Sequence, residues 1–267
     1  MKGLKSRFKP VLAATLLCCV VATSAHATDL LDTVKHAGVL RIAMEGTYPP
    51  FDYRNNDGQL EGFDVEVAKA VAARLGVKPE FITTEWSGIL AGLQAGKFDV
   101  IVNQVGITPA RKQVLDFSEP YIYSAATLLQ RRNDTRQFKS LEDLKGLKVG
   151  VTMGSNYVDL VKTNRAVNLQ VYPGTPENLS DLAAGRIDAA LNDRLMIKYL
   201  IKNSHLPLRP GESIPGGETE MGIPFRKGNP KFAKAVNDAI GTMRQDGTLK
   251  KLSMQWFGTD TTTPTPQ

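Results

Sequence analysis

The chain has 267 residues, of which 42% are hydrophobic, 22% charged and 7% aromatic. This is the composition of a globular protein, and it excludes the disordered and fibrous classes. The length is about twice that of a common domain of roughly 100 to 150 residues, so two lobes with separate cores are possible.

The N-terminal residues predict a cleaved secretory signal over residues 1–27. Four basic residues precede an apolar run at 11–22, and Ala25-His26-Ala27 supplies small residues at the cleavage site. The run is shorter than the about 20 residues that a membrane-spanning helix needs. We therefore expect an exported, freely diffusing protein.

Cleavage of this signal changes the charge and the cysteine content. It removes four of the 33 basic residues and no acidic one, which leaves 33 − 4 = 29 basic against 27 acidic residues, a net charge of about +2. No basic cluster indicates nucleic-acid binding. Both cysteines, Cys18 and Cys19, also lie in the signal, and neither follows a small residue as a lipid-anchored cysteine would. The mature chain thus has no thiol.

The first half of the mature chain alternates strands and helices. The patterns predict strands at 39–45 and 79–84, a helix at 64–75 that ends at Gly76, and a second helix from Ser87. The second half repeats this order with strands at 148–152 and 169–172 and helices at 155–164, 175–184 and 194–203.

An internal repeat links the two halves. Residues 90–104 and 179–193 share the pattern L-x-x-L-x-A-G-basic-apolar-D-x-x-apolar-N-polar, which indicates the end of a helix followed by a short strand. Each half is therefore βαβαβ, which predicts an α/β fold of two lobes, each with a doubly wound, mainly parallel sheet. One continuous sheet is the alternative.

The order of the elements also predicts the lobe boundaries. Lobe one is expected to be discontinuous, since a strand at 222–227 and a helix from Asn229 resume it after lobe two. The expected segments are 28–123 with 221–258 for lobe one, 124–220 for lobe two, 123–126 and 217–221 for the two hinge strands, and 259–267 for a flexible tail.

Polar residues follow the predicted strands, where open α/β sheets bind ligands. The planar guanidinium of Arg111 can donate two hydrogen bonds to a carboxylate. The predicted helix start at Ser155-Asn156 favours an anion, and Asp193 can bind a cation. One anion site beside one cation site suits an α-amino acid. Each residue also has a purely structural alternative: Arg111 as a solvated helix residue, Asp193 and Ser155 as helix caps.

Several motifs in this sequence resemble one known family. They are G-T-Y-P-P-F at 46–51, G-F-D-V at 62–65, I-T-P-A-R at 107–111, D-F-S-E-P-Y at 116–121, G-R-I-D-A at 185–189, and D-G-T at 246–248 with W-F-G at 256–258. In this order they look like the periplasmic polar-amino-acid-binding proteins of ABC importers. The combination of E-G-T-Y-P-P-F, V-N-Q-V and N-D-R-L looks most like the L-cystine-binding branch. This resemblance implies two lobes that close over an amino acid by a hinge motion.

The resemblance also implies roles for single residues. Arg111 would clamp the ligand α-carboxylate, Asp193 would take the α-ammonium, and Tyr48 and Trp86 would lie against the ligand side chain. Asn103 and Gln104 stand where many relatives carry serines, and Ser155-Asn156 replaces a threonine pair, which argues against histidine or arginine as ligand. The complete set of expected ligand-binding residues is Glu45, Tyr48, Phe51, Trp86, Asn103, Gln104, Gly106, Arg111, Met153, Gly154, Ser155, Asn156 and Asp193.

The sequence keeps two rival classes open. A periplasmic dehydratase could use Glu45 as a general acid, and an extracytoplasmic sensor or adhesion protein could share the fold. No nucleophile, zinc or phosphate-loop motif is present, and His36 and His205 are far apart. We therefore expect no catalytic residue, metal or cofactor. The expected ligand is an amino acid, with L-cystine preferred over glutamine, arginine or histidine. The expected protein partners are the membrane permease subunits of an ABC importer. We expect the protein to be a monomer.

Overall fold

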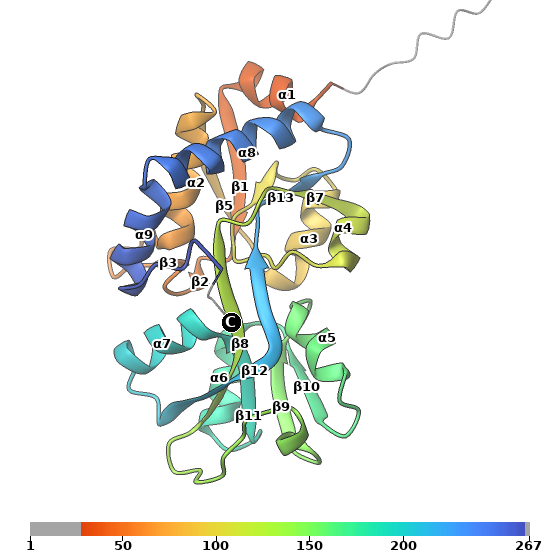
Figure 1. Ribbon diagram of the computed structural model, residues 1–267, viewed down its shortest axis with the longest axis vertical. Coiled ribbons are helices and arrows are strands. Elements are labelled where there is room, and N and C mark those ends of the chain that lie inside the picture. The colour runs from red at the N-terminus through yellow and green to blue at the C-terminus, as the bar shows by residue number, and fades with distance from the viewer. Residues whose placement is uncertain (1–27, 265–267) are drawn as a thin grey trace, which may run out of the picture.

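The computed structural model describes residues 28–264, which form two lobes, one above the other in Figure 1. Each lobe is built on its own five-stranded sheet, so the alternative of one continuous sheet does not apply to these residues. The predicted secretory signal, with both cysteines, lies outside the described residues.

Lobe one, the upper lobe of Figure 1, contains the sheet β5-β1-β6-β13-β7. Its strands are β1 (Val39–Met44), β5 (Lys78–Thr83), β6 (Val100–Ile101), β7 (Leu115–Phe117) and β13 (Pro224–Arg226). Its helices are α1 (Leu30–Ala37), α2 (Phe63–Arg74), α3 (Trp86–Gln94), α4 (Pro109–Val114), α8 (Pro230–Gln245) and α9 (Thr248–Phe257).

Lobe two contains the sheet β10-β9-β11-β8-β12. Its strands are β8 (Ile122–Arg131), β9 (Lys148–Thr152), β10 (Asn168–Tyr172), β11 (Ala189–Asp193) and β12 (Leu208–Met221). Its helices are the short 3-10 helix η1 (Glu142–Leu144), α5 (Asn156–Lys162), α6 (Thr175–Ala183) and α7 (Arg194–Asn203).

The repeated sequence pattern corresponds to a repeated topology. In lobe one, β1 pairs in parallel with β5 and β6, and in lobe two β9 pairs in parallel with β10 and β11. Each lobe therefore has its first parallel strand between the second and the third, as a doubly wound sheet requires. The antiparallel strands β13 in lobe one and β8 in lobe two complete the sheets.

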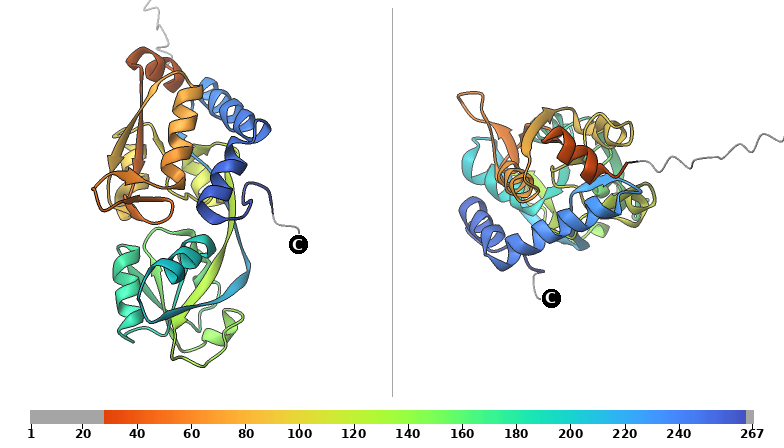
Figure 2. Two further views of the ribbon diagram at one scale, coloured as in Figure 1. Left: turned by 90° about the vertical axis from the view of Figure 1, so that its left-hand side faces the viewer. Right: turned by 90° about the horizontal axis from the view of Figure 1, so that it is seen from above.

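Two long strands cross between the lobes and pair with each other. β8 and β12 are antiparallel, with Tyr123 opposite Glu220 and Ala125 opposite Glu218. Seen from the side, both strands run along the same edge of the molecule (Figure 2). The returning strand begins at Leu208, earlier than the segment 217–221 expected from the sequence, and two register shifts interrupt its pairing.

The sequence patterns did not predict a small three-stranded sheet in lobe one. It consists of β2 (Thr47–Tyr48), β3 (Asp52–Arg54) and β4 (Leu60–Glu61), which are too short to show a periodicity. Gly62 follows β4 with φ 137°, and a Cβ there would lie 2.2 Å from the Phe51 carbonyl oxygen. Only glycine fits at this position, which carries the chain from β4 into α2.

The expected flexible tail is wrong for residues 259–262. The Ser253 hydroxyl donates to the Thr259 carbonyl at 2.6 Å and accepts from the Thr261 N–H at 2.9 Å. The Thr261 carbonyl in turn accepts from the N–H of Tyr123 on β8 at 2.8 Å. These contacts bury Thr261. The segment has no apolar periodicity because hydrogen bonds, and not an apolar face, hold it on lobe one.

Among residues 28–264, no helix is long and apolar enough to cross a membrane. Within the same range, no group of histidine, cysteine and acidic side chains is arranged to hold a metal ion.

Candidate functional site

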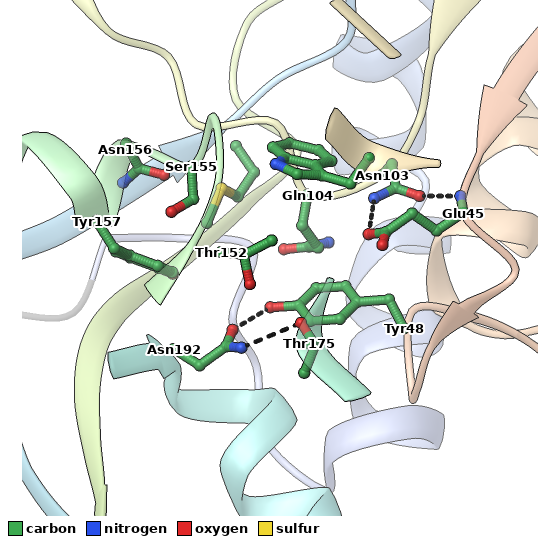
Figure 3. A pocket seen from close by; sticks show the side chains of 12 residues that line it. Glu45, Tyr48, Asn103, Gln104, Thr152, Ser155, Asn156, Tyr157, Thr175 and Asn192 are labelled. Atoms are coloured by element: carbon green, nitrogen blue, oxygen red, sulfur yellow. Dashed lines mark hydrogen bonds between the residues drawn. The ribbon is translucent and has the colours of Figure 1, made fainter. Parts of the chain in front are cut away.

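A pocket lies between the lobes and is open to solvent on one side. The residues that line it are Glu45, Tyr48, Trp86, Asn103, Gln104, Thr152, Ser155, Asn156, Tyr157, Thr175, Asn192 and Met221. Figure 3 shows their side chains arranged around the space. Both lobes and the crossing strand β12 contribute to the wall.

Several polar atoms in this wall have no hydrogen-bond partner. They are the hydroxyls of Thr152 and Ser155 and the carbonyl oxygen of the Gln104 amide, all buried. A buried polar group without a partner costs about 1 to 3 kcal/mol. Ser155 stands at the N-cap position of α5, but its side chain makes no capping hydrogen bond. The pocket is therefore suited to a ligand that supplies polar partners.

Glu45 and Asn103 form one end of the pocket. The Glu45 N–H donates to the Asn103 amide oxygen at 2.6 Å, and the Asn103 amide nitrogen donates to the Glu45 carboxylate at 3.2 Å. Burial raises the pKa of Glu45 to about 7, although the Asn103 hydrogen bond opposes the shift; Glu85 and Glu177 add to it. This carboxyl group would therefore be stabilised in its charged form by a cationic group of a ligand.

Tyr48 connects the two lobes across the pocket. Its hydroxyl donates to the Asn192 amide oxygen at 2.6 Å, and the Asn192 amide nitrogen donates to the Thr175 hydroxyl at 3.4 Å (Figure 3). The Tyr48 ring stacks on Phe51 with a centroid distance of 5.3 Å. Tyr48 belongs to lobe one and Asn192 to lobe two, so the hydrogen bond between them exists only when the lobes are together.

Tyr48→Phe is expected to weaken binding of every ligand by the same factor of about 2 to 10, because it removes one hydrogen bond of the closed form and keeps the ring. Calorimetry with several amino acids measures this factor. The matched control is Tyr172→Phe, which removes a hydroxyl bonded to Asp181 at 2.7 Å within lobe two and should leave affinity unchanged. A loss confined to one ligand would mean that the Tyr48 hydroxyl contacts that ligand.

Arg111 lies beside the pocket, on α4. Its guanidinium donates to the carbonyls of Gly106 at 2.7 Å and Gly154 at 2.9 Å and lies 5.8 Å from the centre of the Trp86 ring. Arg111 is 9% exposed, and burial lowers its pKa to about 10. None of the ion pairs within residues 28–264 includes Arg111. The side chain is a desolvated cation with unused N–H donors, not a solvated helix residue.

Asp193 ends β11 and caps α7. One carboxylate oxygen accepts from the N–H groups of Leu195 at 2.7 Å and Met196 at 3.3 Å, so the capping interpretation holds. The other oxygen is buried and forms no hydrogen bond of full geometry, although the Ser124 and Tyr157 hydroxyls lie close to the carboxylate. Burial raises the pKa of this carboxyl group. Its charge lies next to Tyr157, which lines the pocket. Capping of α7 does not use the second carboxylate oxygen of Asp193, so this oxygen can accept a hydrogen bond from a ligand.

The structure brings together seven of the expected site residues in the pocket wall: Glu45, Tyr48, Trp86, Asn103, Gln104, Ser155 and Asn156. The other six do not line it. Phe51 lies beneath Tyr48, Met153 is 46% exposed, and Gly106 and Gly154 offer their carbonyls to Arg111. Arg111 and Gly154 line an adjacent pocket that shares Ser155 and Asn156 with the main one. Asp193, the sixth residue, is fully buried at the end of β11 and lines neither pocket.

The sequence-based set omits five lining residues: Thr152, Tyr157, Thr175, Asn192 and Met221. Position alone indicates three of them, since Thr152 ends β9, Thr175 begins α6 and Asn192 lies at the end of the repeat strand β11. Met221 ends the returning strand β12, whose course between the lobes has no sequence signal of its own.

Two lobes joined by paired crossing strands, with a polar pocket between them, define a ligand-binding protein of the periplasmic type. Residues 40–259 match the bacterial extracellular solute-binding proteins, family 3, and the chain belongs to this family. The expected family and two-lobed fold are thereby confirmed.

Three proteins illustrate the similarity. The L-cystine-binding protein TcyJ of Escherichia coli K12 is 42% identical over 254 residues, which cover 94% of this chain and 95% of that protein. The L-cystine-binding protein TcyA of Bacillus subtilis is 36% identical, covering 97% and 98%. The crystal structure of the ancestral amino acid-binding protein AncCDT-1, described as a precursor of cyclohexadienyl dehydratase, matches with a TM-score of 0.78 at 33% identity and covers 86% of this chain and 100% of that chain.

Proposed function

We propose that this protein captures a free amino acid, L-cystine, in the periplasm by closure of its two lobes and delivers it, as a monomer, to the permease subunits of an ABC importer. The observation that carries the proposal is a pair of buried, opposite charges near one pocket, neither of which takes part in an ion pair within residues 28–264. The Arg111 guanidinium has no carboxylate partner, and the Asp193 carboxylate has a free oxygen.

These two charges fit the head of an α-amino acid. A carboxylate can accept from the N–H donors of Arg111 that Gly106 and Gly154 leave unused. An ammonium can donate to the free oxygen of Asp193. Burying either charge alone is costly, and a zwitterion compensates both at once. Arg111 comes from lobe one and Asp193 from lobe two, so the ligand would hold the lobes together.

The opposite end of the pocket fits a second polar head. Glu45 offers a carboxylate and Asn103 and Gln104 offer amides, while Tyr48 and Trp86 offer aromatic faces. L-cystine has a second zwitterionic head and a disulfide that packs well on aromatic rings. The names of the relatives TcyJ and TcyA support the same ligand.

The proposal is tested with purified mature protein in a thermal-shift panel of L-cystine, L-glutamine, L-arginine and L-histidine under non-reducing conditions. Native mass spectrometry of the best ligand gives the stoichiometry. We expect one L-cystine per chain and the largest rise in melting temperature with L-cystine, because a ligand that binds only the folded state stabilises it. No shift with any of the four would contradict amino-acid binding.

The affinity for L-cystine is expected to rise with pH between 5.5 and 7.5. Free Glu45, with its pKa near 7, is largely protonated at pH 5.5, and the distal ammonium of the ligand would favour the ionised form. Binding then releases a proton at low pH, and affinity falls by up to about tenfold per pH unit below the pKa. Calorimetry across this range measures the slope.

Glu45→Gln is the control for this pH dependence, since it keeps the shape and removes the titration. The variant should bind more weakly at pH 7.5 and with a flatter profile. Other buried carboxyl groups near the cleft, Asp52, Asp64 and Asp193, remain in both proteins, so the difference between the two pH profiles is due to the loss of the Glu45 carboxyl group. Identical slopes would place the distal ammonium away from Glu45.

A dehydratase is the second candidate, favoured by two observations. Glu45 has a raised pKa in the pocket, as a general acid needs, and the similar protein AncCDT-1 is described as a precursor of such an enzyme. Incubation with prephenate or arogenate separates the candidates. Turnover would support the enzyme, and recovery of unmodified amino acid in a stoichiometric complex would support the binder.

A further inference from the structure

Asp64 is a fully buried carboxylate behind the pocket wall, at the start of α2. It does not line the pocket, yet it contacts a residue that does. One carboxylate oxygen accepts from the backbone N–H of Gln104 at 2.9 Å. The other accepts from the Gln104 amide nitrogen at 2.8 Å and from the Tyr121 hydroxyl at 3.0 Å. Gln104 is therefore held by its backbone and its side chain at the same time.

Gln104 has an unusual backbone conformation. Its φ is 51°, and among residues 28–264 it is the only residue other than glycine with a positive φ. A positive φ is an unfavourable backbone conformation for a residue other than glycine, and it persists where surrounding contacts hold the residue in place. The hydrogen bond from the Gln104 N–H to Asp64 is such a contact.

The same contacts determine which end of the Gln104 amide faces the ligand space. The Gln104 amide nitrogen points to Asp64, and the ionised form of this carboxyl group, whose pKa burial raises to about 7, only accepts hydrogen bonds. The amide oxygen then points away from Asp64, is buried and has no partner. Gln104 lines the pocket, and Figure 3 shows its side chain extending into the ring of lining residues.

We propose that Asp64 is a positioning residue for ligand recognition: it fixes the Gln104 amide so that its oxygen faces the bound ligand and accepts from an N–H group. The inference rests on the proposed function, because it assigns a partner on the ligand of that same pocket. The proposed ligands are therefore amino acids that place an N–H donor against the Gln104 side of the pocket.

Asp64→Asn reverses the orientation. The Gln104 backbone N–H still needs an acceptor, so the oxygen of the new amide takes that place and its nitrogen faces the Gln104 side chain. Two amide nitrogens cannot bond to each other, and the Gln104 amide must turn, which presents its nitrogen to the ligand. With L-cystine as probe and L-arginine and L-glutamine in parallel, we expect affinity to fall about tenfold to hundredfold for a hydrogen bond to a charged donor.

The double variant Asp64→Asn/Gln104→Glu is the rescue. A carboxylate at position 104 can accept from the new amide nitrogen with one oxygen and still present the other to the ligand. We expect it to bind L-cystine at least about tenfold more tightly than Asp64→Asn alone, whatever its melting temperature. Tyr121→Phe is the matched control, because it removes one partner of Asp64 and the 3.4 Å contact from the Gln104 amide nitrogen to the Tyr121 hydroxyl, but keeps both bonds from Gln104 to Asp64. It should lower the melting temperature and change affinity by less than about threefold.

The outcomes separate three cases. Loss in Asp64→Asn with recovery in the double variant supports the positioning role. Wild-type affinity in Asp64→Asn, or loss without recovery in the double variant, overturns it and leaves amino-acid binding intact. Wild-type protein that binds none of the amino acids overturns the proposed function, and with it the donor assigned to Gln104.

Discussion

Arg111→Ala is expected to lower affinity for the amino-acid ligand by a factor of about 100 or more. Removal of one partner from a buried charge pair costs about 3 to 5 kcal/mol, because the other charge is left in a site without water. The ligand-free fold should survive, since Arg111 is a buried cation whose removal also removes a desolvation cost. Calorimetry measures the affinity, and thermal melting measures the fold.

Arg111→Lys is the matched control for this variant. It keeps the charge and loses the planar fork, so we expect it to bind more tightly than Arg111→Ala and more weakly than the wild type. Unchanged affinity in Arg111→Ala, with a normal melting temperature, would show that the bonds to Gly106 and Gly154 are the whole role of Arg111.

Asp193→Asn is expected to lower affinity about tenfold to hundredfold without loss of stability. Asparagine caps helices as well as aspartate does, so the bonds to Leu195 and Met196 are kept. The variant lacks the negative charge that would pair with the α-ammonium. Because burial raises the pKa of Asp193, its charged form is costly in the free protein, and the melting temperature should stay equal or rise.

Asp29→Asn is the control at another helix N-terminus. Asp29 caps α1 and accepts from the Leu31 N–H at 2.9 Å. Figure 1 shows α1 at the top of lobe one, on the side away from lobe two. Asp29→Asn should leave affinity unchanged. If Asp193→Asn lowers only the melting temperature and binds the ligand normally, then Asp193 is a cap and nothing more.

The sequence predicts most of the regular elements because their signals are local. The apolar spacing within α2 and the glycine after it place that helix, and the repeat at 90–104 and 179–193 predicts equal topology in the two lobes. The strand ends of these repeated units hold Asn103, Gln104 and Asn192, which line the pocket. Periodicity and chain order are sufficient for this part of the site.

Contacts between distant parts of the chain could not be predicted in this way. Tyr48 and Asn192 are 144 residues apart, and nothing in either segment indicates their hydrogen bond. The same is true of Asp64, whose motif indicates a helix start but not a bond to Gln104. The buried segment around Thr261 was expected to be flexible because single hydrogen bonds leave no pattern in the sequence.

The measurement that tests the central claim most directly is calorimetric titration of the mature protein with L-cystine in non-reducing buffer, repeated after reduction of the ligand to cysteine. The pocket, with charged or amide groups at both ends, predicts tight binding of one L-cystine per chain and much weaker binding of cysteine, glutamine, arginine and histidine. Tighter binding of any of these four than of L-cystine would contradict the assignment of the ligand.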